Sequence, residues 1–445
     1  MTQPSKTTAW HVATPCALLA LLAASRADAA EQAVRVSAGD TAWVLTSSAL
    51  VLLMTVPGLA LFYGGMVRRK NVLSMLMQSY VLAALVSVQW ALFGYSLAFA
   101  PGRWGLLGGL HWAGLAHVSA SAPFAAYSET IPHQAYMVFQ CMFAVITPAL
   151  ITGAFAERIS FPGFLLFSLL WMTLVYDPIA HWVWAVDGWI HGMGALDFAG
   201  GTVVHLSSGV AALAGALMVG RRRGYLREPM PPHNLTLTLT GAGLLWVGWF
   251  GFNAGSALAA NGLAVSAFVA THLGASAAAL AWAAAEWWTL GKPTVLGIAS
   301  GAVAGLVAIT PACGYVTPMS ALIIGLGAGL LCYWAVRLKP RLGYDDALDV
   351  VGVHGVGGSW GALATGLFAS AAVNPAGANG LFYGNPRQLL VQLVAVLASG
   401  AFSFVASLVL FKIVDVTVGL RVSEEAEQMG VDLSEHDENA YALEG

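Results

Sequence analysis

Two histidines occupy matching places in two apolar stretches of the chain. Asp197 to Gly209 and Asp346 to Gly358 both fit the pattern D-x7-H-x3-G, with His205 and His354 at the histidine position. An imidazole can accept or donate a proton near neutral pH and can also bind a metal ion. The two motifs therefore indicate a proton relay, a lining for the path of a small polar molecule, or part of a metal site.

The composition decides which kind of element carries these motifs. Of the 445 residues 58% are hydrophobic and only 9% are charged, whereas an ordinary globular domain carries about 25% charge. Such a chain cannot cover a surface that faces water, which excludes a soluble enzyme, a basic nucleic-acid binder and a disordered scaffold. We predict an all-α membrane protein, because helices satisfy their own backbone hydrogen bonds in lipid.

Eleven apolar stretches are separated by Gly and Pro breaks or by charge. They cover roughly residues 42–67, 72–100, 134–156, 162–185, 199–220, 235–256, 263–290, 294–312, 317–338, 349–370 and 388–418. The fifth and tenth stretches carry the two motifs. Because five is odd, the two copies run in opposite directions, which is the mark of a five-plus-five inverted repeat with its site near the midplane.

The spacing also predicts where the histidines lie in depth. A helix rises about 1.5 Å per residue, so each histidine lies roughly 12 Å along its helix from its own aspartate. The middle of a ~30 Å hydrocarbon core lies at about 15 Å. We therefore expect His205 and His354 to be neighbours near the centre of the protein.

The chain ends and the basic residues give an orientation. Residues 1–29 combine a short apolar run with a final Ala-Asp-Ala, which favours a cleaved signal peptide over an uncleaved anchor. The N-terminus of the membrane domain, residues 30–420, is then outside, and the acidic tail, residues 421–445, is cytoplasmic and solvated. In this topology fourteen Lys and Arg residues lie inside and only Arg35, Arg103 and Arg387 lie outside, as the positive-inside rule requires.

Aromatic residues near the outer ends of several spans point to a small cation. The segments Phe139 to Phe143, Trp182 to Trp184 and Trp249 to Ser256 combine aromatic rings with polar side chains. An aromatic belt at the membrane boundary is one interpretation. A vestibule that attracts a small cation through cation-π contacts of about 0.5–2 kcal/mol each is the other. Moving a bare cation into a dry interior costs far more. The cation would therefore have to lose a proton and cross as a neutral molecule, which ammonium can do.

Metal and redox chemistry are the weaker alternatives for the histidine pair. A catalytic zinc usually takes three protein ligands, and no third His or Glu shares the predicted midplane. The four cysteines have no metal-ligand spacing. We therefore expect no metal, no cofactor and no enzymatic activity.

Several longer motifs resemble those of the Amt/Mep/Rh ammonium transporter superfamily, most closely the bacterial Amt type. They are Pro57 to Gly65 (PGLALFYGG), Gly153 to Arg158 (GAFAER), Ala195 to His205 (ALDFAGGTVVH), Gly248 to Ser256 (GWFGFNAGS) and Val353 to Gly358 (VHGVGG). They follow the family's order over nearly the whole mature chain. The linker from Ala185 to Leu196 departs from the family's glycine-rich pattern.

The resemblance implies a role for each site residue. Phe143, Trp184 and Ser256 would recruit ammonium at the outer face, Phe143 and Phe252 would form a gate, and His205 and His354 would be the twin histidines of the pore. Asp197 would orient backbone groups and support deprotonation, although a plain helix N-cap remains an alternative role for it.

The resemblance also implies a homotrimer in the inner membrane, with a PII-type regulatory protein at its cytoplasmic face. Two alternative functions remain open, a neutral gas channel of the Rh kind and an ammonium sensor.

Overall fold

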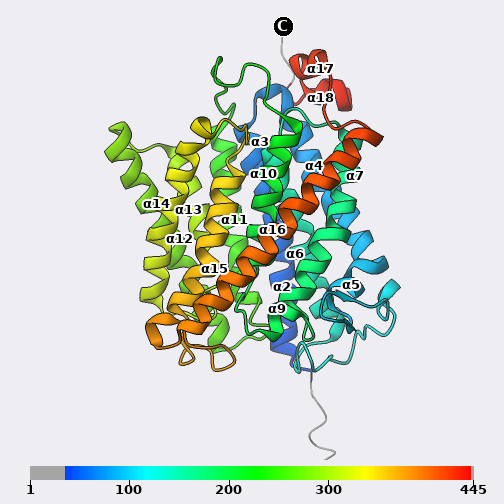
Figure 1. The fold of residues 1–445 in the computed structure, drawn as a ribbon, viewed down its shortest axis with the longest axis vertical. Coiled ribbons are helices and arrows are strands. Elements are labelled where there is room, and N and C mark those ends of the chain that lie inside the picture. Colours follow the sequence, from blue (N-terminus) through cyan, green and yellow to red (C-terminus); the bar gives the residue numbers. More distant parts are fainter. Residues whose placement is uncertain (1–35, 442–445) are drawn as a thin grey trace, which may run out of the picture.

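The computed structural model describes residues 36–441. The predicted signal peptide, residues 1–29, lies outside this part of the chain. The described chain forms one bundle of helices, and its first helix begins at the end of the bundle opposite α17 and α18 (Figure 1).

Nine helical segments within residues 36–441 are long and apolar enough to cross a membrane. Several of them join two or three elements, so that α2, η1 and α3 form the first and α4, η3 and α5 the second. The nine are Ala38–Met66, Arg69–Phe99, His133–Ala154, Phe161–Gly192, Gly201–Val219, Leu235–Gly255, Gly262–Leu290, Pro318–Leu342 and Pro386–Thr417.

The elements within these segments have the following bounds. They are α2 (Ala38–Leu53), η1 (Met54–Leu59), α3 (Ala60–Met66), η2 (Arg69–Asn71), α4 (Val72–Gln89), η3 (Trp90–Gly94), α5 (Tyr95–Phe99), α6 (His133–Ile151), η5 (Thr152–Ala154), α7 (Phe161–Trp171), η6 (Met172–Tyr176), α8 (Asp177–Trp184), α9 (Trp189–Gly192), η7 (Gly201–Leu206), α10 (Ser207–Val219), α11 (Leu235–Gly255), α12 (Gly262–Leu290), α14 (Pro318–Leu342) and α16 (Pro386–Thr417).

The other two predicted spans are helical but fall outside these nine. The span predicted at 294–312 is α13 (Val295–Ile309), an apolar helix of 15 residues. The span predicted at 349–370 is a π-helical turn, η8 (Val351–Val356), followed by α15 (Gly357–Phe368). Both pack inside the bundle, α13 against α12 and α14, and α15 against α13 and α16.

Five π-helical turns interrupt the long helices, at η1, η3, η6, η7 and η8. Such turns are rare and are often found at functional sites. Pro57 explains η1, because proline has no backbone N–H to donate within the helix. The turns η7 and η8 hold His205 and His354, so both histidines lie where the helix is locally widened.

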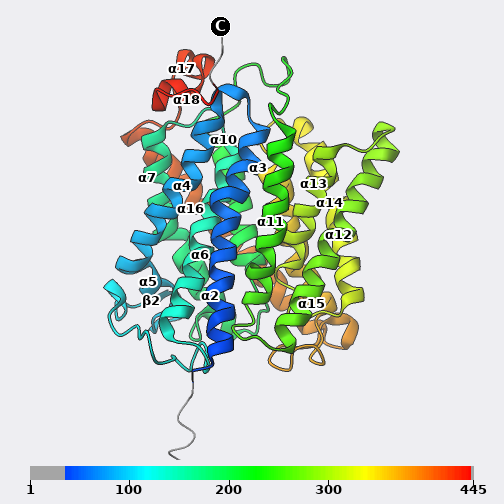
Figure 2. The ribbon, with the colours of Figure 1, turned by 180° about the vertical axis from the view of Figure 1, so that it is seen from behind.

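Glycines allow the helices that carry the histidines to approach closely. A Cβ built on Gly209 of α10 would lie 2.1 Å from the backbone nitrogen of Gly355 in η8. No larger side chain fits between these two backbones. Figure 2 shows α2, in dark blue, crossing the face of the bundle beside α6 and α11, its main packing partners.

The end of the bundle at which α2 begins carries short irregular elements between the second and third spans. These are β1 (Gly102–Arg103), which pairs antiparallel with β2 (Leu107–Gly108), and η4 (Ala113–Leu115). Another short turn, η9 (Leu381–Tyr383), precedes α16. These segments lie at the end of the bundle opposite the C-terminal helices (Figure 1).

The C-terminal tail packs against the bundle, which corrects the expectation of a solvated acidic segment. It forms α17 (Glu424–Met429) and α18 (Val431–His436). The Asp432 carboxylate accepts hydrogen bonds from the backbone N–H groups of Leu73 and Ser74 at 3.0 and 2.8 Å. Glu427 is 2% exposed and pairs with Arg421 at 2.6 Å. Asp432 and Glu427 thus cap a helix and pair with arginine, whereas Glu424, Glu425, Asp437 and Glu438 remain exposed.

Candidate functional site

A cavity of about 400 Å³ opens beside the C-terminal ends of α8 and α11. Four of the five residues predicted for the recruitment site, the gate and deprotonation line it, namely Phe143, Trp184, Asp197 and Ser256, whereas Phe252 does not. The other lining residues are Ala126, Tyr127, Tyr136, Phe139, Gln140, Val186, His191, Phe198, Leu258, Tyr315 and Ala376. The cavity is therefore rich in aromatic rings and contains one carboxylate.

Two rings of the cavity wall, Phe143 and Trp184, lie next to a third, Phe252, which does not line the cavity. The rings of Phe143 and Trp184 are perpendicular, with centroids 5.8 Å apart. Beneath them Phe143 and Phe252 lie 4.2 Å apart at an angle of 34°. Trp182 instead donates from its indole N–H to the carbonyl of Leu106 and packs on Phe402. Trp184 is thus the tryptophan that faces Phe143.

Ser256 lies at the end of α11, one helical turn beyond Phe252. Its hydroxyl donates to the carbonyl oxygen of Phe252 at 2.8 Å, which leaves its lone pairs able to accept a hydrogen bond. The hydroxyl therefore offers an acceptor beside the aromatic rings.

Asp197 organises the backbone at the start of η7. Its two carboxylate oxygens accept hydrogen bonds from four consecutive backbone N–H groups, those of Gly200, Gly201, Thr202 and Val203, at 2.7–3.2 Å. Its own carbonyl accepts the indole N–H of Trp184 at 2.9 Å. The Asp197 carboxylate thus caps the helix that carries His205, and its backbone carbonyl fixes Trp184.

The two histidines are neighbours in the interior. The Nδ1 atoms of His205 and His354 are 3.2 Å apart, and the ring centroids are 5.3 Å apart. A hydrogen bond at this distance requires one Nδ1 to carry a proton and the other to accept it. Nε2 of His205 is buried and has no hydrogen-bond partner among residues 36–441, so it is free to bond a small molecule.

The aromatic wall continues down to the histidines. The ring of His205 lies 6.0 Å from that of Phe252 and is nearly parallel to it. On another side it stacks on Trp249 at 5.4 Å and 24°. Trp249 donates its indole N–H to the hydroxyl of Thr310 at 2.8 Å, which fixes the plane of the indole against the imidazole.

The second motif has a similar anchor at the start of its own π-helical turn, η8. The Asp346 carboxylate accepts from the backbone N–H of Val351, at the start of η8, at 2.8 Å. Lys339 pairs with Asp349 at 2.5 Å and donates to the carbonyl of Asp346. Each histidine helix therefore begins at a buried aspartate that accepts backbone N–H groups.

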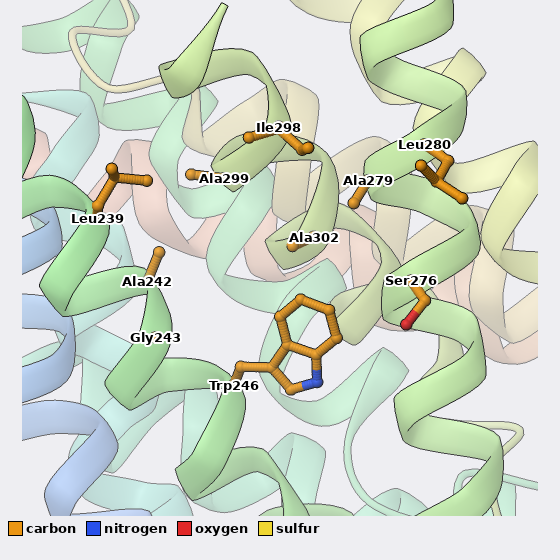
Figure 3. Close-up of a pocket in the computed structure, with 10 residues that line it drawn as sticks. All are labelled: Leu239, Ala242, Gly243, Trp246, Ser276, Ala279, Leu280, Ile298, Ala299 and Ala302. Atoms are coloured by element: carbon orange, nitrogen blue, oxygen red, sulfur yellow. The ribbon is translucent and has the colours of Figure 1, made fainter.

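A second cavity lies on the side of the bundle, and no comparable cluster of polar and ionisable side chains lines it. It is a groove between α11, α12 and α13, lined by Leu239, Ala242, Gly243, Trp246, Ser276, Ala279, Leu280, Ile298, Ala299 and Ala302 (Figure 3). Apart from the Ser276 hydroxyl and the Trp246 indole N–H its side chains are apolar. None of the predicted site residues lines it.

The described residues contain no group of three or more His, Cys, Asp or Glu side chains arranged to hold a metal ion. The histidine pair is surrounded by aromatic and aliphatic side chains. Its geometry fits a small molecule that can donate and accept hydrogen bonds.

The fold and the site define a multi-pass membrane protein with a polar pair inside an apolar core, and comparison with known proteins gives its family. Residues 42–441 match the Ammonium Transporter Family. The chain belongs to this family.

Several relatives are similar over nearly their whole length. An ammonium transporter of Bacillus subtilis is 54% identical over 404 residues, which cover 91% of this chain and 98% of that protein. The ammonium transporter Amt1 of Archaeoglobus fulgidus is 47% identical over 405 residues, covering 91% and 100%. The proteins of this family are transporters or channels, not enzymes.

Solved structures share the fold. The crystal structure of Mep2 from Candida albicans matches with a TM-score of 0.84 and 35% identity, covering 92% of this chain and 94% of that one. A structure described as a sensor Amt protein matches with a TM-score of 0.81 and 28% identity, covering 89% and 98%.

Sequence reasoning missed several residues that shape the site. Thr310, which holds Trp249, and the π-helical turns around the histidines gave no signal that a single sequence could reveal. His191 lines the cavity from the linker that departs from the family pattern, and that departure was its only signal.

Proposed function

We propose that this protein carries ammonium across the membrane by recruiting it at the outer cavity, removing a proton and passing ammonia along the histidine pair. The observation that supports this most is one continuous column of rings. It runs from the open cavity through Phe143 and Phe252 to His205 and His354. Phe143, Trp184 and Ser256 would be the recruitment site, and Phe143 and Phe252 the gate.

The energetics of the column favour ammonia over ammonium as the species that crosses. The rings of Phe143 and Trp184 and the Ser256 hydroxyl can hold a cation at the water-exposed end. Beneath the stacked Phe143 and Phe252 the wall contains no carboxylate to balance a charge, since Asp197 is occupied by four backbone N–H groups. A desolvated cation is far more costly there than a neutral amine.

The histidine pair can bind a small neutral molecule that donates and accepts hydrogen bonds. Ammonia can donate to one ring nitrogen and accept from another, so an imidazole pair replaces part of its lost hydration. Imidazoles can also pass a proton on. We propose that the proton follows by this relay, so that transport moves net charge.

The wider architecture that we propose has eleven crossings in a five-plus-five inverted repeat, with the N-terminus outside and the C-terminus inside. Two observations support it. The start of α2 and the tail helices lie at opposite ends of the bundle (Figure 1), as an odd number of crossings requires. In addition, η7 and η8 each follow a buried aspartate that accepts the first N–H groups of the turn.

The resemblance to bacterial Amt proteins supports further assignments. We propose that residues 1–29 are a cleaved signal peptide, so that the mature N-terminus is exported, and that residues 30–420 form the transporter domain in the inner membrane. We also propose that residues 421–445 are a cytoplasmic tail, and that the protein is a homotrimer that takes up nitrogen and binds a PII-type protein at its cytoplasmic face.

A sensor is the second candidate function. It is favoured by the matching structure described as a sensor Amt protein. A sensor would bind ammonium without sustained flux, whereas a neutral channel of the Rh kind would pass ammonia without current.

The test is to reconstitute the full chain in liposomes and record current and lumenal pH after an ammonium pulse. We expect a current that saturates with ammonium and falls at least about tenfold in His205→Ala or His354→Ala, as loss of a proton-transfer group typically does. His272→Ala is the matched control, because this histidine lies on α12 away from the pair and packs on Phe250 and Trp246.

Each result points to one function. A saturating current that depends on the pair and not on His272 supports charge-moving transport. Alkalinisation of the lumen above that of empty liposomes, without current, overturns the proposed charge movement in favour of a neutral channel. Ammonium binding without either signal overturns transport in favour of a sensor.

A further inference from the structure

His191 is the one imidazole among the described residues that line the outer cavity. It lies in the one-turn helix α9, within the linker that joins Trp184 to Asp197. The linker backbone is fixed on two sides. The N–H of Trp189 donates to the carbonyl of Gly105 at 3.2 Å, and the side chain of Gln388 donates to the carbonyl of Gly194 at 2.9 Å. An anchored backbone therefore presents His191 at the cavity.

The His191 side chain is exposed and has no hydrogen-bond partner among residues 36–441. Other histidines of the outer end are engaged. His133 bonds the hydroxyl of Tyr95 at 2.6 Å, and His181 bonds the carbonyl of Ala98 at 3.1 Å. His191 is thus an unengaged base in contact with both water and the cavity.

The proposed function requires a base at this place, because ammonium must lose its proton before the gate. The other polar groups of the cavity are poor candidates. The Asp197 carboxylate accepts four backbone N–H groups. Gln140 is an amide, and the hydroxyls of Tyr127, Tyr136 and Tyr315 are weak bases. The histidine pair lies beyond Phe143 and Phe252.

The electrostatic surroundings leave His191 unpaired. Asp187 is the acidic residue nearest to it in the linker. Its carboxylate accepts the backbone N–H of Gly102 at 2.7 Å and lies 3.7 Å from Nε2 of His181. It does not line the cavity, where Asp197 is the one carboxylate and the three tyrosines are the other titratable groups.

We propose that His191 is the base that removes the proton from ammonium in the outer cavity. One N–H bond of ammonium breaks and its electron pair stays on nitrogen, which gives ammonia. The proton bonds to the free ring nitrogen of His191 and exchanges with the water of the vestibule, from which the proton that the histidine pair relays is drawn. This step rests on the proposed transport function and precedes any movement of the proton through the histidine pair.

The experiment measures initial rates of ammonium-driven flux in proteoliposomes of the full chain, in weakly buffered medium. We compare His191→Ala with the unchanged protein and with His111→Ala. His111 is a matched control because it is an exposed histidine of the outer loop that stacks on His117 and does not line the cavity. External imidazole is then added as a small diffusible base.

We expect His191→Ala to be at least about tenfold slower near neutral pH, in line with the contribution of a positioned base. His111→Ala should keep the unchanged rate. External imidazole should restore most of the lost rate in His191→Ala and leave the other two proteins unaffected. Restoration by an added base distinguishes a proton acceptor from a residue that only shapes the linker.

Other outcomes overturn the assignment. Equal rates for His191→Ala and the unchanged protein would show that water or another group takes the proton. A slow His191→Ala that imidazole does not restore, or a His191→Gln variant with the full rate, would show a structural role. If the unchanged protein itself gives no ammonium-driven flux, the proposed function fails before the role of His191 is tested.

Discussion

At the scale of single residues, the Asp197 side chain organises the backbone at the start of the helix that carries His205. One carboxylate satisfies four backbone N–H groups that would otherwise be buried at the start of a helix. Helix N-termini leave such groups unpaired, and a carboxylate near them is further stabilised by the helix dipole. The same four hydrogen bonds therefore serve both as a helix N-cap and as a support for the site.

Replacing Asp197 by Asn should therefore destabilise the protein although the side chains have nearly the same shape. The amide has one acceptor oxygen, and its NH2 group would face backbone N–H donors. Leaving buried donors unpaired costs about 1–3 kcal/mol. We expect a lower melting temperature in detergent, together with reduced ammonium flux.

Asp187→Asn is the comparison for this prediction. That carboxylate accepts one backbone N–H, from Gly102, in an exposed position. Its variant should melt within error of the unchanged protein. Equal melting temperatures for the Asp197 and Asp187 variants would contradict the capping argument.

At the scale of elements, the contact between α10 and η8 sets the distance between the histidines. Gly209 faces the backbone of Gly355, one residue from His354. The two backbones approach so closely because neither glycine has a side chain, as in other packed membrane helices. The distance between the two imidazoles therefore depends on a contact between the backbones of Gly209 and Gly355.

A methyl group at Gly209 should separate the two helices. Overpacking of this kind typically costs about 1–3 kcal/mol, and the atoms nearest to the new Cβ are backbone atoms of His354 and Gly355, which cannot rotate away. We expect Gly209→Ala to lose most of its flux and to melt earlier. Gly243→Ala on α11 is the control, because its Cβ would meet nothing within 4 Å.

The comparison of the two variants distinguishes an effect on the spacing of the histidine pair from a general effect of substitution on folding. Gly209→Ala that retains full flux would show that the spacing of the pair is not critical. A loss of both flux and expression in Gly243→Ala as well would show that the assay reports a general intolerance to substitution.

At the scale of the whole molecule, buried ion pairs tie together the loops of the tail end. Arg222 binds Asp345 through two nitrogens, at 2.8 and 3.0 Å, and also lies 3.5 Å from Glu157. Arg68 pairs with Glu157 at 2.7 Å. Four loops that are far apart in the sequence, those of Arg68, Glu157, Arg222 and Asp345, are thus held by charge.

The same network makes stability depend on pH. Burial opposes ionisation of Glu157, but the nearby Arg222 and Arg68 guanidinium groups outweigh it and lower the pKa of Glu157. The balance at Asp345 is similar, with burial opposed by Arg222, and its pKa is also lowered. A lowered acid pKa gives stability that is present above the unfolded-state values of about 4 and is lost as pH falls.

We therefore expect Arg222→Gln to be less stable at neutral pH by about 3–5 kcal/mol, as when one partner of a buried pair is removed. The variant should also lose less further stability on acidification below about pH 4, because the pKa values of its acids are no longer held low. Thermal unfolding across pH measures both effects. Lys412→Gln, which removes an exposed pair with Asp415, should change neither.

Much of this arrangement could be predicted from the sequence, for identifiable reasons. Lipid forces the backbone into helices, so the apolar stretches predicted the positions of the helices to within a few residues. The repeated D-x7-H spacing predicted that His205 and His354 meet, because it places both at a similar depth.

Other features depend on contacts that a single sequence does not reveal. The tail looks like a solvated acidic segment until Asp432 is placed at the first turn of α4. The stacking of Trp249 on His205 depends on Thr310, which lies 61 residues away along the chain. Such pairings are set by packing between spans and not by local pattern.

The π-helical turns at η7 and η8 have a consequence for how the length of this chain can change. A π-turn holds one residue more than an α-helical turn. A chain that lost one residue from either turn could close it into regular helix and keep its flanking packing, but the imidazole would swing by about 100° around the helix axis. Single-residue deletions at these two turns should therefore yield proteins that fold and insert but do not conduct.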